Sequence, residues 1–310
     1  MNQKILILGS TGFLGKNLYN EILDSDLKND EIITLKGKSE VNILDFDKFD
    51  NYIKKIKPDI VFNCSSFVGG IAYGYKYPAK ILNDNTQMVI NIFKSSLENQ
   101  VKQLINPISN CAYPGNLNVY EESNFWDGKP HESVFNYALT RRLIVALSES
   151  YYKEYNLNSC NLVLSNMYGP NDHFDEERSH ALGALIKKIS DAKKNNDKTV
   201  NIWGTGSPIR EWLYVKDGAK AMIKSTELKE GNYFLNIGVN KGISIKNLAE
   251  KIAEILNWDG NFNYQTEKPD GALEKRVEGS KSYTQLKWKP EVSLDNGLKE
   301  TIDWYAKQTK

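Results

Sequence analysis

Tyr137 and Arg141 stand four residues apart in the segment NYALTRR, at the start of a stretch with helical spacing. Side chains at that separation lie on one face of a helix. A phenol in water releases its proton only near pH ~10, and a neighbouring cation favours its charged form. Such a pair can protonate a ketone oxygen as hydride arrives, although an ordinary surface pair has the same spacing.

A hydroxyl at a strand end would complete this chemistry. Ser109 closes the apolar run QLINPI. In a parallel sheet the carboxyl ends of the strands face the crevice where ligands bind, so this hydroxyl can hold the carbonyl oxygen that Tyr137 protonates. Cys111 follows two residues later and points to the same side if the chain stays extended.

The segment GSTGFLG places Gly9, Gly12 and Gly15 directly after an apolar run and before a helical one. In a dinucleotide-binding loop the first glycine allows a tight turn, the second lets the backbone approach a pyrophosphate, and the third lets the helix pack closely. A tight turn without a ligand is the alternative. A P-loop is disfavoured because the glycine spacing is one residue too long and Asn17 replaces the magnesium-binding hydroxyl.

The end of the second apolar run bears on the cofactor. An NAD enzyme usually carries Asp or Glu there, to hold the ribose 2′-hydroxyl. Here the segment reads LKGKSE, so Lys36 and Lys38 precede any acid. A cation suits a 2′-phosphate, which favours NADPH over NAD, unless these lysines belong to a solvated turn.

These residues need a parallel sheet to bring them together. Apolar runs separated by amphipathic segments predict β-α-β units, hence an α/β fold with a doubly wound parallel sheet. Helices are predicted over 85–100 and 137–156. Pro107 cannot donate to a sheet, so we expect a local distortion there. After residue 169 the pattern weakens, which predicts a smaller interleaved α/β domain. We assign 1–168 plus about 212–238 to the dinucleotide-binding domain, and about 169–211 plus 239–310 to the other.

Composition narrows the class of protein. The chain has 310 residues, 25% charged residues and a net charge of +1, which argues against nucleic-acid binding. Its apolar runs are too short for a membrane span and its start has no signal-peptide pattern. The three cysteines show no metal-ligand spacing, so we expect no metal and a reducing, cytoplasmic setting.

Ser109, Tyr137 and Arg141 together resemble the Ser…Tyr-x-x-x-Lys pattern of the extended short-chain dehydrogenases/reductases. Arg141 departs from the family lysine: it keeps the charge but is longer and planar, so its ribose contact can shift. Five ordered segments narrow the resemblance to GDP-L-fucose synthases: FVGGI (67–71), SNCAYPG (109–115), MYGPNDHFD…SHALGALIKK (167–188), WGTGSPIREWLYVKD (203–217) and KPDGALEK (268–275).

The resemblance implies a two-part reaction. In that family a 4-keto sugar is epimerised at C3 and C5 and then reduced at C4 with NADPH. Epimerisation needs one group that removes a proton and another that returns it on the opposite face. Cys111 and His180 match the family's cysteine and histidine. By themselves they are more typical of a small buried side chain and a helix cap, and His131 and His173 are interpreted as loop residues.

The resemblance also implies the binding residues and a homodimer through a four-helix bundle of the 85–100 and 137–154 helices. The cofactor set comprises Gly9, Thr11, Gly12, Phe13, Leu14, Gly15, Lys36, Lys38, Ser65, Asn85, Tyr137, Arg141, Asn166 and Met167. The GDP-sugar set comprises Val68, Gly69, Gly70, Lys188, Trp203, Arg210 and Lys275.

Two alternatives stay open. Phe67 and Gly183 depart from the family pattern and could reshape the pocket for another 4-keto hexose or a heptose, in a reductase that acts after a separate epimerase. Loss of the lysine could also leave a nucleotide-binding regulatory module without chemistry.

Overall fold

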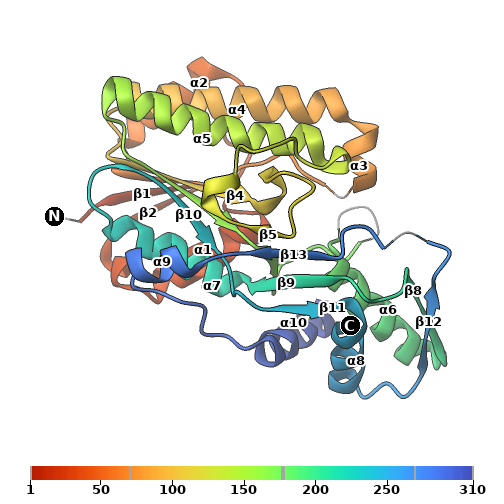
Figure 1. Cartoon of the computed structure of the whole chain (residues 1–310). Coiled ribbons are helices and arrows are strands. Elements are labelled where there is room, and N and C mark those ends of the chain that lie inside the picture. The colour runs from red at the N-terminus through yellow and green to blue at the C-terminus, as the bar shows by residue number, and fades with distance from the viewer. Residues whose placement is uncertain (1, 70, 176–178, 269, 309–310) are drawn as a thin grey trace.

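The first apolar runs form parallel strands of one sheet in the computed structural model, which describes residues 2–69, 71–175, 179–268 and 270–308 (Figure 1). The strand order is β10-β6-β4-β3-β1-β2. Ile5 and Ile7 of β1 face one core cluster and Leu6 and Leu8 face the other, which explains the uninterrupted apolar run. The bounds are β1 (Lys4–Leu8), β2 (Glu31–Leu35), β3 (Ile60–Asn63), β4 (Gln103–Ser109), β6 (Ser159–Leu164) and β10 (Asn232–Ile237).

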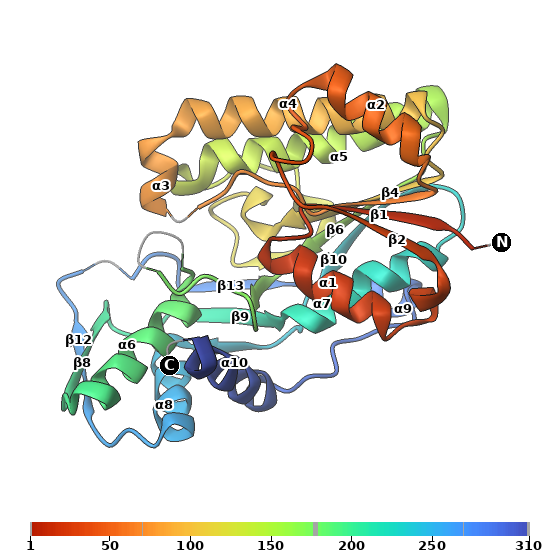
Figure 2. The same cartoon turned by 180° about the vertical axis from the view of Figure 1, so that it is seen from behind.

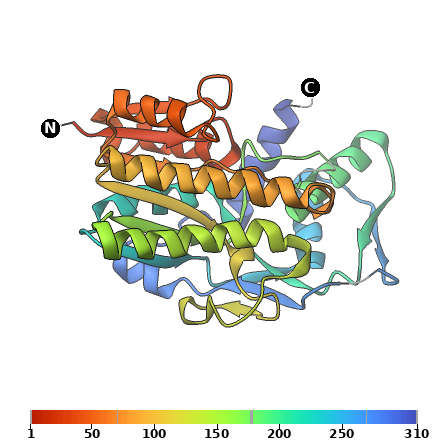
Figure 3. The same cartoon turned by 90° about the horizontal axis from the view of Figure 1, so that it is seen from above.

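Helices cover both faces of this sheet, which confirms the doubly wound fold. Helices α1 (Phe13–Leu23) and α7 (Val215–Lys224) pack on one face (Figure 2). The other face carries α2 (Phe46–Ile56), α4 (Pro78–Glu98) and α5 (Phe135–Tyr155), and α4 and α5 run side by side (Figure 3). Helix α5 begins at Phe135, which puts Tyr137 in its first turn. Within the described ranges, no helix combines the length and apolarity needed to cross a membrane.

The order in which successive strands join the sheet changes side at β1, because β2 pairs with one edge of β1 and β3 pairs with the other. Ligands of open α/β sheets bind in the crevice outside the carboxyl ends of the strands at such a reversal. The loop with Gly9 follows β1, and the loop from Cys64 to Phe67 follows β3. Both loops therefore border the expected binding crevice.

Pro107 lies inside β4 without interrupting it. The expected distortion is absent, because the pairing of β4 with β3 ends at Ile105, two residues earlier. In a parallel sheet the backbone N–H groups of successive residues point in turn to the strands on either side. The N–H of Gln103 points to the β3 side, because it donates to the carbonyl oxygen of Asp59, just before β3. Pro107 lies four residues after Gln103, so its nitrogen also points to the β3 side. The described pairing with β3 offers no acceptor at that position, so the missing N–H of proline costs no hydrogen bond there.

A second, smaller sheet confirms the interleaved domain. Its order is β11-β9-β13-β5, with β7 on β9, beside a two-stranded β12-β8 ribbon. Strand β5 comes from the loop after β4, so both halves of the chain contribute to this sheet. The residue limits of the two domains stay a prediction. The bounds are β5 (Val119–Tyr120), β7 (Asn166–Tyr168), β8 (Thr199–Trp203), β9 (Ile209–Tyr214), β11 (Gly242–Ser244), β12 (Asn261–Gln265), β13 (Glu274–Val277), α3 (Ile71–Lys76), α6 (Ala181–Asn195), α8 (Ile245–Leu256), α9 (Ser280–Gln285) and α10 (Leu294–Gln308).

Glu211 on β9 joins the two sheets. Its side chain is fully buried (0% exposed). The carboxylate accepts backbone N–H bonds from Val277 of β13 and from Val239 and Asn240, which follow β10. Burial raises the pKa of Glu211, and these N–H donors act in the opposite direction by favouring the charged form. One carboxylate thus fixes how the smaller sheet lies against the end of β10.

Glu211→Gln should lower the free energy of unfolding by about 2–4 kcal/mol, because an amide offers one acceptor oxygen and turns an N–H₂ group toward other N–H donors. Urea unfolding measures this change. Glu230→Gln, an exposed glutamate in a loop, should stay within about 0.5 kcal/mol of the wild type. Equal stability of the two variants would contradict the role given to Glu211.

Candidate active site

Backbone contacts explain two of the three loop glycines. Gly9 has a φ of +73°, and a Cβ there would lie 2.6 Å from the carbonyl oxygen of Cys64. A Cβ on Gly15 would collide with the carbonyl oxygen of Gly9. At Gly12 a Cβ would meet only the same oxygen at 3.4 Å, an ordinary contact. Packing of the protein itself therefore does not require glycine at position 12, and the open space there is what close approach of a ligand would need.

The amino end of α1 opens at this loop. Helix α1 starts at Phe13, and Gly12 supplies no side-chain cap for its first N–H groups. Thr11 is exposed, whereas Phe13 and Leu14 are half-buried. Uncapped N–H groups and the positive end of the helix dipole form a site that suits a pyrophosphate.

A hollow of about 170 Å³ continues from this loop past the end of β2. Gly9, Lys38, Ser65 and Phe67 are among its lining residues. Lys36 is exposed and does not line it, and its backbone N–H donates to the Glu40 carboxylate. Of the two lysines predicted to recognise the cofactor, only Lys38 is placed on this hollow.

Asn85 shapes the loop after β3. Its side chain is fully buried and bonds both the N–H and the carbonyl oxygen of Phe67, at 2.9 and 2.8 Å. A further bond runs to the carbonyl oxygen of Ile81. These bonds occupy the amide group, so the structure gives Asn85 the task of positioning Ser66 and Phe67.

A cleft of about 720 Å³ brings the predicted chemistry together. Ser109, Cys111, Tyr137 and His180 all line it, from β4, the turn after β4, helix α5 and the residue that caps α6. These residues are far apart in the sequence. Their meeting in one cleft is the result that matters most for function. Val68, Gly69 and Asn166 line the same cleft; Gly70 lies outside the described residues.

Arg141 lies against Tyr137 as the helical spacing predicts. Its Cζ is 4.9 Å from the centroid of the Tyr137 ring. The arginine is only 2% exposed, and its Nε has no hydrogen-bond partner among the described residues. The Tyr137 hydroxyl is 3.3 Å from the Oγ of Ser66. The Tyr137 phenol, which lines the cleft, thus lies between a buried positive charge and a hydroxyl.

The chain does not stay extended after Ser109. Residues 110–112 form a 3-10 turn, η2 (Asn110–Ala112), and the Ser109 Oγ caps it by accepting the N–H of Cys111 at 3.4 Å. Cys111 therefore reaches the cleft through this turn. Burial raises the pKa of its thiol, and the Ser109 hydroxyl and the Arg141 charge partly oppose that effect.

His180 faces a buried carboxylate. Its Nδ1 lies 3.9 Å from the Oδ1 of Asp172. The carboxylate raises the pKa of His180, and partial burial opposes this. Sequence reasoning missed Asp172, although an acid eight residues before the candidate histidine was visible in YGPND.

Two cations border a smaller hollow of about 140 Å³ that adjoins the cleft. Arg210 and Lys275 line it together with Cys111 and Asn166. Burial lowers the pKa of both cations, and in Lys275 the charge of Arg210 adds to the effect. The Nζ of Lys275 already donates to the carbonyl oxygens of two loop residues before β5. An anion here would be held mainly by Arg210.

Three predicted residues lie elsewhere. Trp203 is 62% exposed, with the Lys268 ammonium 5.4 Å from its ring centroid. Lys188 is exposed and reaches the carbonyl oxygen of Asn201 at 3.5 Å. Neither residue belongs to the described lining of the cleft or of the adjoining hollow. Met167 packs against the core cluster beneath β7.

Sequence reasoning also missed part of the cleft wall. Tyr75, Pro78 and Phe135 give one side an apolar surface, and Asn110 bonds Asn166 across the floor at 3.3 Å. No motif signals these residues, because α3, α4 and the start of α5 meet only in the folded chain.

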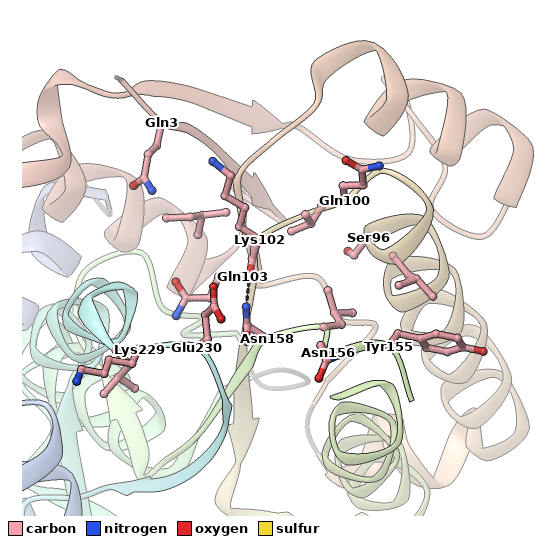
Figure 4. A pocket seen from close by; sticks show the side chains of 15 residues that line it. Gln3, Ser96, Gln100, Lys102, Gln103, Tyr155, Asn156, Asn158, Lys229 and Glu230 are labelled. Carbon is pink, nitrogen blue, oxygen red and sulfur yellow. Dashed lines mark hydrogen bonds between the residues drawn. The ribbon is translucent and has the colours of Figure 1, made fainter. Parts of the chain in front are cut away.

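Another hollow, of about 420 Å³, lies at the opposite edge of the large sheet (Figure 4). Gln3, Gln103 and Asn158 lie at the amino ends of β1, β4 and β6, and the Asn158 amide donates to the carbonyl oxygen of Lys102. The catalytic candidates are absent from its described lining. This edge is not where such sheets bind cofactors.

The family model for the NAD dependent epimerase/dehydratase family matches residues 5–238. This chain belongs to that family. The match includes the glycine loop, Ser109, Tyr137 and His180, and it confirms the resemblance to the extended short-chain dehydrogenases/reductases.

Individual members of the epimerase/dehydratase family resemble this chain over nearly its whole length. GDP-L-fucose synthase 1 of Arabidopsis thaliana is 32% identical over 98% of this chain and 93% of its own. The solved GDP-L-fucose synthetase of Naegleria fowleri bound to NADP has a TM-score of 0.88 and 25% identity over 99% of this chain and 93% of its own. MlghC, a GDP-mannoheptose C4 reductase of Campylobacter jejuni with NADP bound, has a TM-score of 0.87 and 25% identity over 98% of both chains.

Gly15→Ala should lower the stability of the protein, whereas Gly12→Ala should weaken dinucleotide binding. Gly15→Ala should cost about 1–3 kcal/mol of stability, because its Cβ overlaps the backbone at Gly9. Gly12→Ala should melt like the wild type but bind a nicotinamide dinucleotide at least about tenfold more weakly, because its Cβ occupies the ligand side of the loop. Thermal unfolding and calorimetric titration separate the two effects. Unchanged dinucleotide affinity in a folded Gly12→Ala protein would argue against the site.

Proposed function

We propose that this protein is an NADPH-dependent epimerase and reductase that acts on a GDP-4-keto-6-deoxy-sugar. The observation that carries the proposal is the cleft in which Ser109, Tyr137, Cys111 and His180 meet. The first pair suits reduction of a ketone, and the second suits proton exchange at the carbons next to it.

Reduction at C4 of the sugar needs a hydride, which NADPH would supply when bound. Ser109 holds the carbonyl oxygen, and the Tyr137 hydroxyl gives its proton to the same oxygen as negative charge develops there. Arg141 stabilises the phenolate that remains, because its guanidinium lies over the ring and is shielded from water. The Ser66 hydroxyl, 3.3 Å from the Tyr137 oxygen, gives the phenol a second polar neighbour.

For epimerisation, the ketone acidifies the protons at C3 and C5. One of Cys111 and His180 removes such a proton and the electron pair forms an enolate; the other gives a proton to the opposite face, so no oxidant is needed. Both side chains line the cleft that holds Ser109, as the reaction requires.

The cofactor is proposed to be NADPH. Lys38 lies on the hollow at the end of β2, where a 2′-phosphate would come, and both NADP-bound structures described above share this fold. The hollow bordered by Arg210 and Lys275 suits the substrate diphosphate. Lys188 and Trp203, on the outer side of the smaller domain, are proposed to reach the nucleoside.

The similarity to the C4 reductase of Campylobacter jejuni favours a second candidate, in which this protein only reduces a GDP-4-keto sugar or heptose after a separate epimerase. Incubation in deuterated water without NADPH distinguishes the two. Deuterium at C3 or C5 supports epimerisation, and its absence supports the reductase.

We also propose a homodimer in the cytoplasm. The outer faces of α4 and α5 carry exposed Ile90 and Ala146 beside half-buried Leu143. Two copies of this helix pair would form a four-helix bundle. Sedimentation velocity at micromolar concentration should give the mass of a dimer, and a monomer mass would refute it.

Tyr137→Phe should reduce NADPH oxidation with GDP-4-keto-6-deoxymannose by about 10²–10⁴-fold, because the ketone oxygen loses its proton donor. Tyr155→Phe, at the exposed far end of the same helix, should keep full activity. Absorbance at the NADPH band follows both reactions. Equal or absent turnover in wild type and Tyr137→Phe would instead support a nucleotide-binding module without chemistry.

Lys38→Ala should raise the KM for NADPH by about tenfold and leave the KM for NADH unchanged, since one charge-assisted hydrogen bond contributes about 1.5 kcal/mol or more. Lys36→Ala is the matched control and should have little effect, because Lys36 does not line the hollow. Steady-state kinetics with both cofactors test this. A larger effect of Lys36→Ala would show that the lysines are assigned the wrong way round.

A further inference from the structure

Asp172 is the buried acid nearest to the candidate active-site histidine. Its side chain is 3% exposed, whereas that of His180 is 64% exposed at the cleft. The carboxylate Oδ1 accepts the N–H of His173 at 2.8 Å and lies 3.9 Å from the Nδ1 of His180. Asp172 is therefore held in place by the backbone and faces one specific nitrogen of the imidazole.

The turn that carries Asp172 has an unusual backbone. Gly169 and Asn171 both have positive φ, at +149° and +69°, and the N–H of Asp172 donates to the carbonyl oxygen of Gly169. This turn follows β7 directly, and β7 pairs with β9 in the smaller sheet. A backbone hydrogen bond thus ties Asp172 to Gly169, the residue directly after a strand of the smaller sheet.

His180 occupies a position that disfavours a positive charge. It is the N-cap residue of α6, where the helix dipole presents its positive end. A histidine there would ordinarily stay neutral. The buried carboxylate of Asp172 supplies the opposing charge, and it raises the pKa of His180 above the ordinary value.

We infer that Asp172 is a positioning residue that faces the Nδ1 of His180 and stabilises the charged imidazole, with Nε2–H free to give a proton to the sugar. This inference rests on the epimerase activity proposed above. The Cys111 thiol, whose pKa is raised by burial, first gives its proton to solvent. The C–H bond at C3 or C5 then breaks toward the resulting thiolate, its electron pair forms the enolate, and the Nε2–H of His180 protonates the opposite face. Solvent then returns the proton from Cys111 to His180, so the cycle is balanced and leaves a solvent hydrogen on the carbon.

Other ionisable side chains line the cleft that contains His180. Tyr75, Cys111, Lys129, Glu132 and Tyr137 line the same cleft. Among the described residues, Asp172 is the one whose charge perturbs His180. His173 and Asp175 form a separate exposed pair, at 4.0 Å, which provides a matched control within the same segment.

The decisive measurement is the titration of the histidine rings in the full-length protein. The chain has three histidines, so nitrogen-detected spectra of ¹⁵N-histidine protein can be assigned with His131→Gln and His173→Gln. Asp172→Asn keeps an oxygen for the His173 N–H but removes the charge. It should lower the pKa of His180, while Asp175→Asn should leave it unchanged.

Activity supplies the second readout. Deuterium incorporation at C3 and C5 should slow about tenfold in Asp172→Asn at neutral pH, and its pH profile should move to lower pH with the titration of His180. Reduction of a substrate that is already epimerised should be unaffected. Asp172→Glu, which restores the charge, should recover part of the exchange rate.

Each outcome is decisive. An unchanged His180 titration in Asp172→Asn, or a shifted titration with unchanged exchange, overturns the role of Asp172. If that variant does not fold, a wild-type His180 that titrates at or below the ordinary histidine value overturns it. If the wild type exchanges no deuterium while the titration shifts as expected, the epimerase proposal fails and the coupling of the two side chains stands.

Discussion

One buried carboxylate sets the relation between the two sheets. Glu211 accepts N–H bonds from segments that follow β10 and lie in β13, and its own carbonyl oxygen accepts the side chain of Asn166 in the cleft. A buried charge is tolerated only when its hydrogen bonds are complete. The requirement to satisfy Glu211 therefore holds the large sheet, the small sheet and the cleft floor in one arrangement.

The chemistry of the cleft follows from that arrangement. Ser109 and Tyr137 belong to the large sheet and its covering helix, whereas His180 begins a helix of the smaller domain. Neither half by itself holds both pairs. The burial of Arg141 is energetically costly, because no residue in the described part of the chain forms a hydrogen bond with its Nε. Such a cost is typical of functional sites, where a group is arranged for a ligand or a transition state and not for stability.

Local patterns predicted the elements and several contacts well. Apolar runs gave the strands, the glycine spacing indicated the turn into α1, and the spacing of Tyr137 and Arg141 predicted their contact on α5. Where the predictions were wrong or incomplete, a neighbouring element decided the outcome. Pro107 is accommodated because β3 ends beside it. Cys111 sits in a capped turn because the Ser109 hydroxyl accepts its N–H.

The sequence by itself determined the doubly wound fold, the glycine loop and most of the candidate reacting groups, because these depend on residue type and short spacing. Only the tertiary structure decided that Lys38 and not Lys36 lines the hollow after β2, that Asn85 positions the loop after β3, and that Asp172 faces His180. Those facts depend on the directions of side chains from separate elements. Such directions are fixed when burial and hydrogen bonding are satisfied for the whole chain at once.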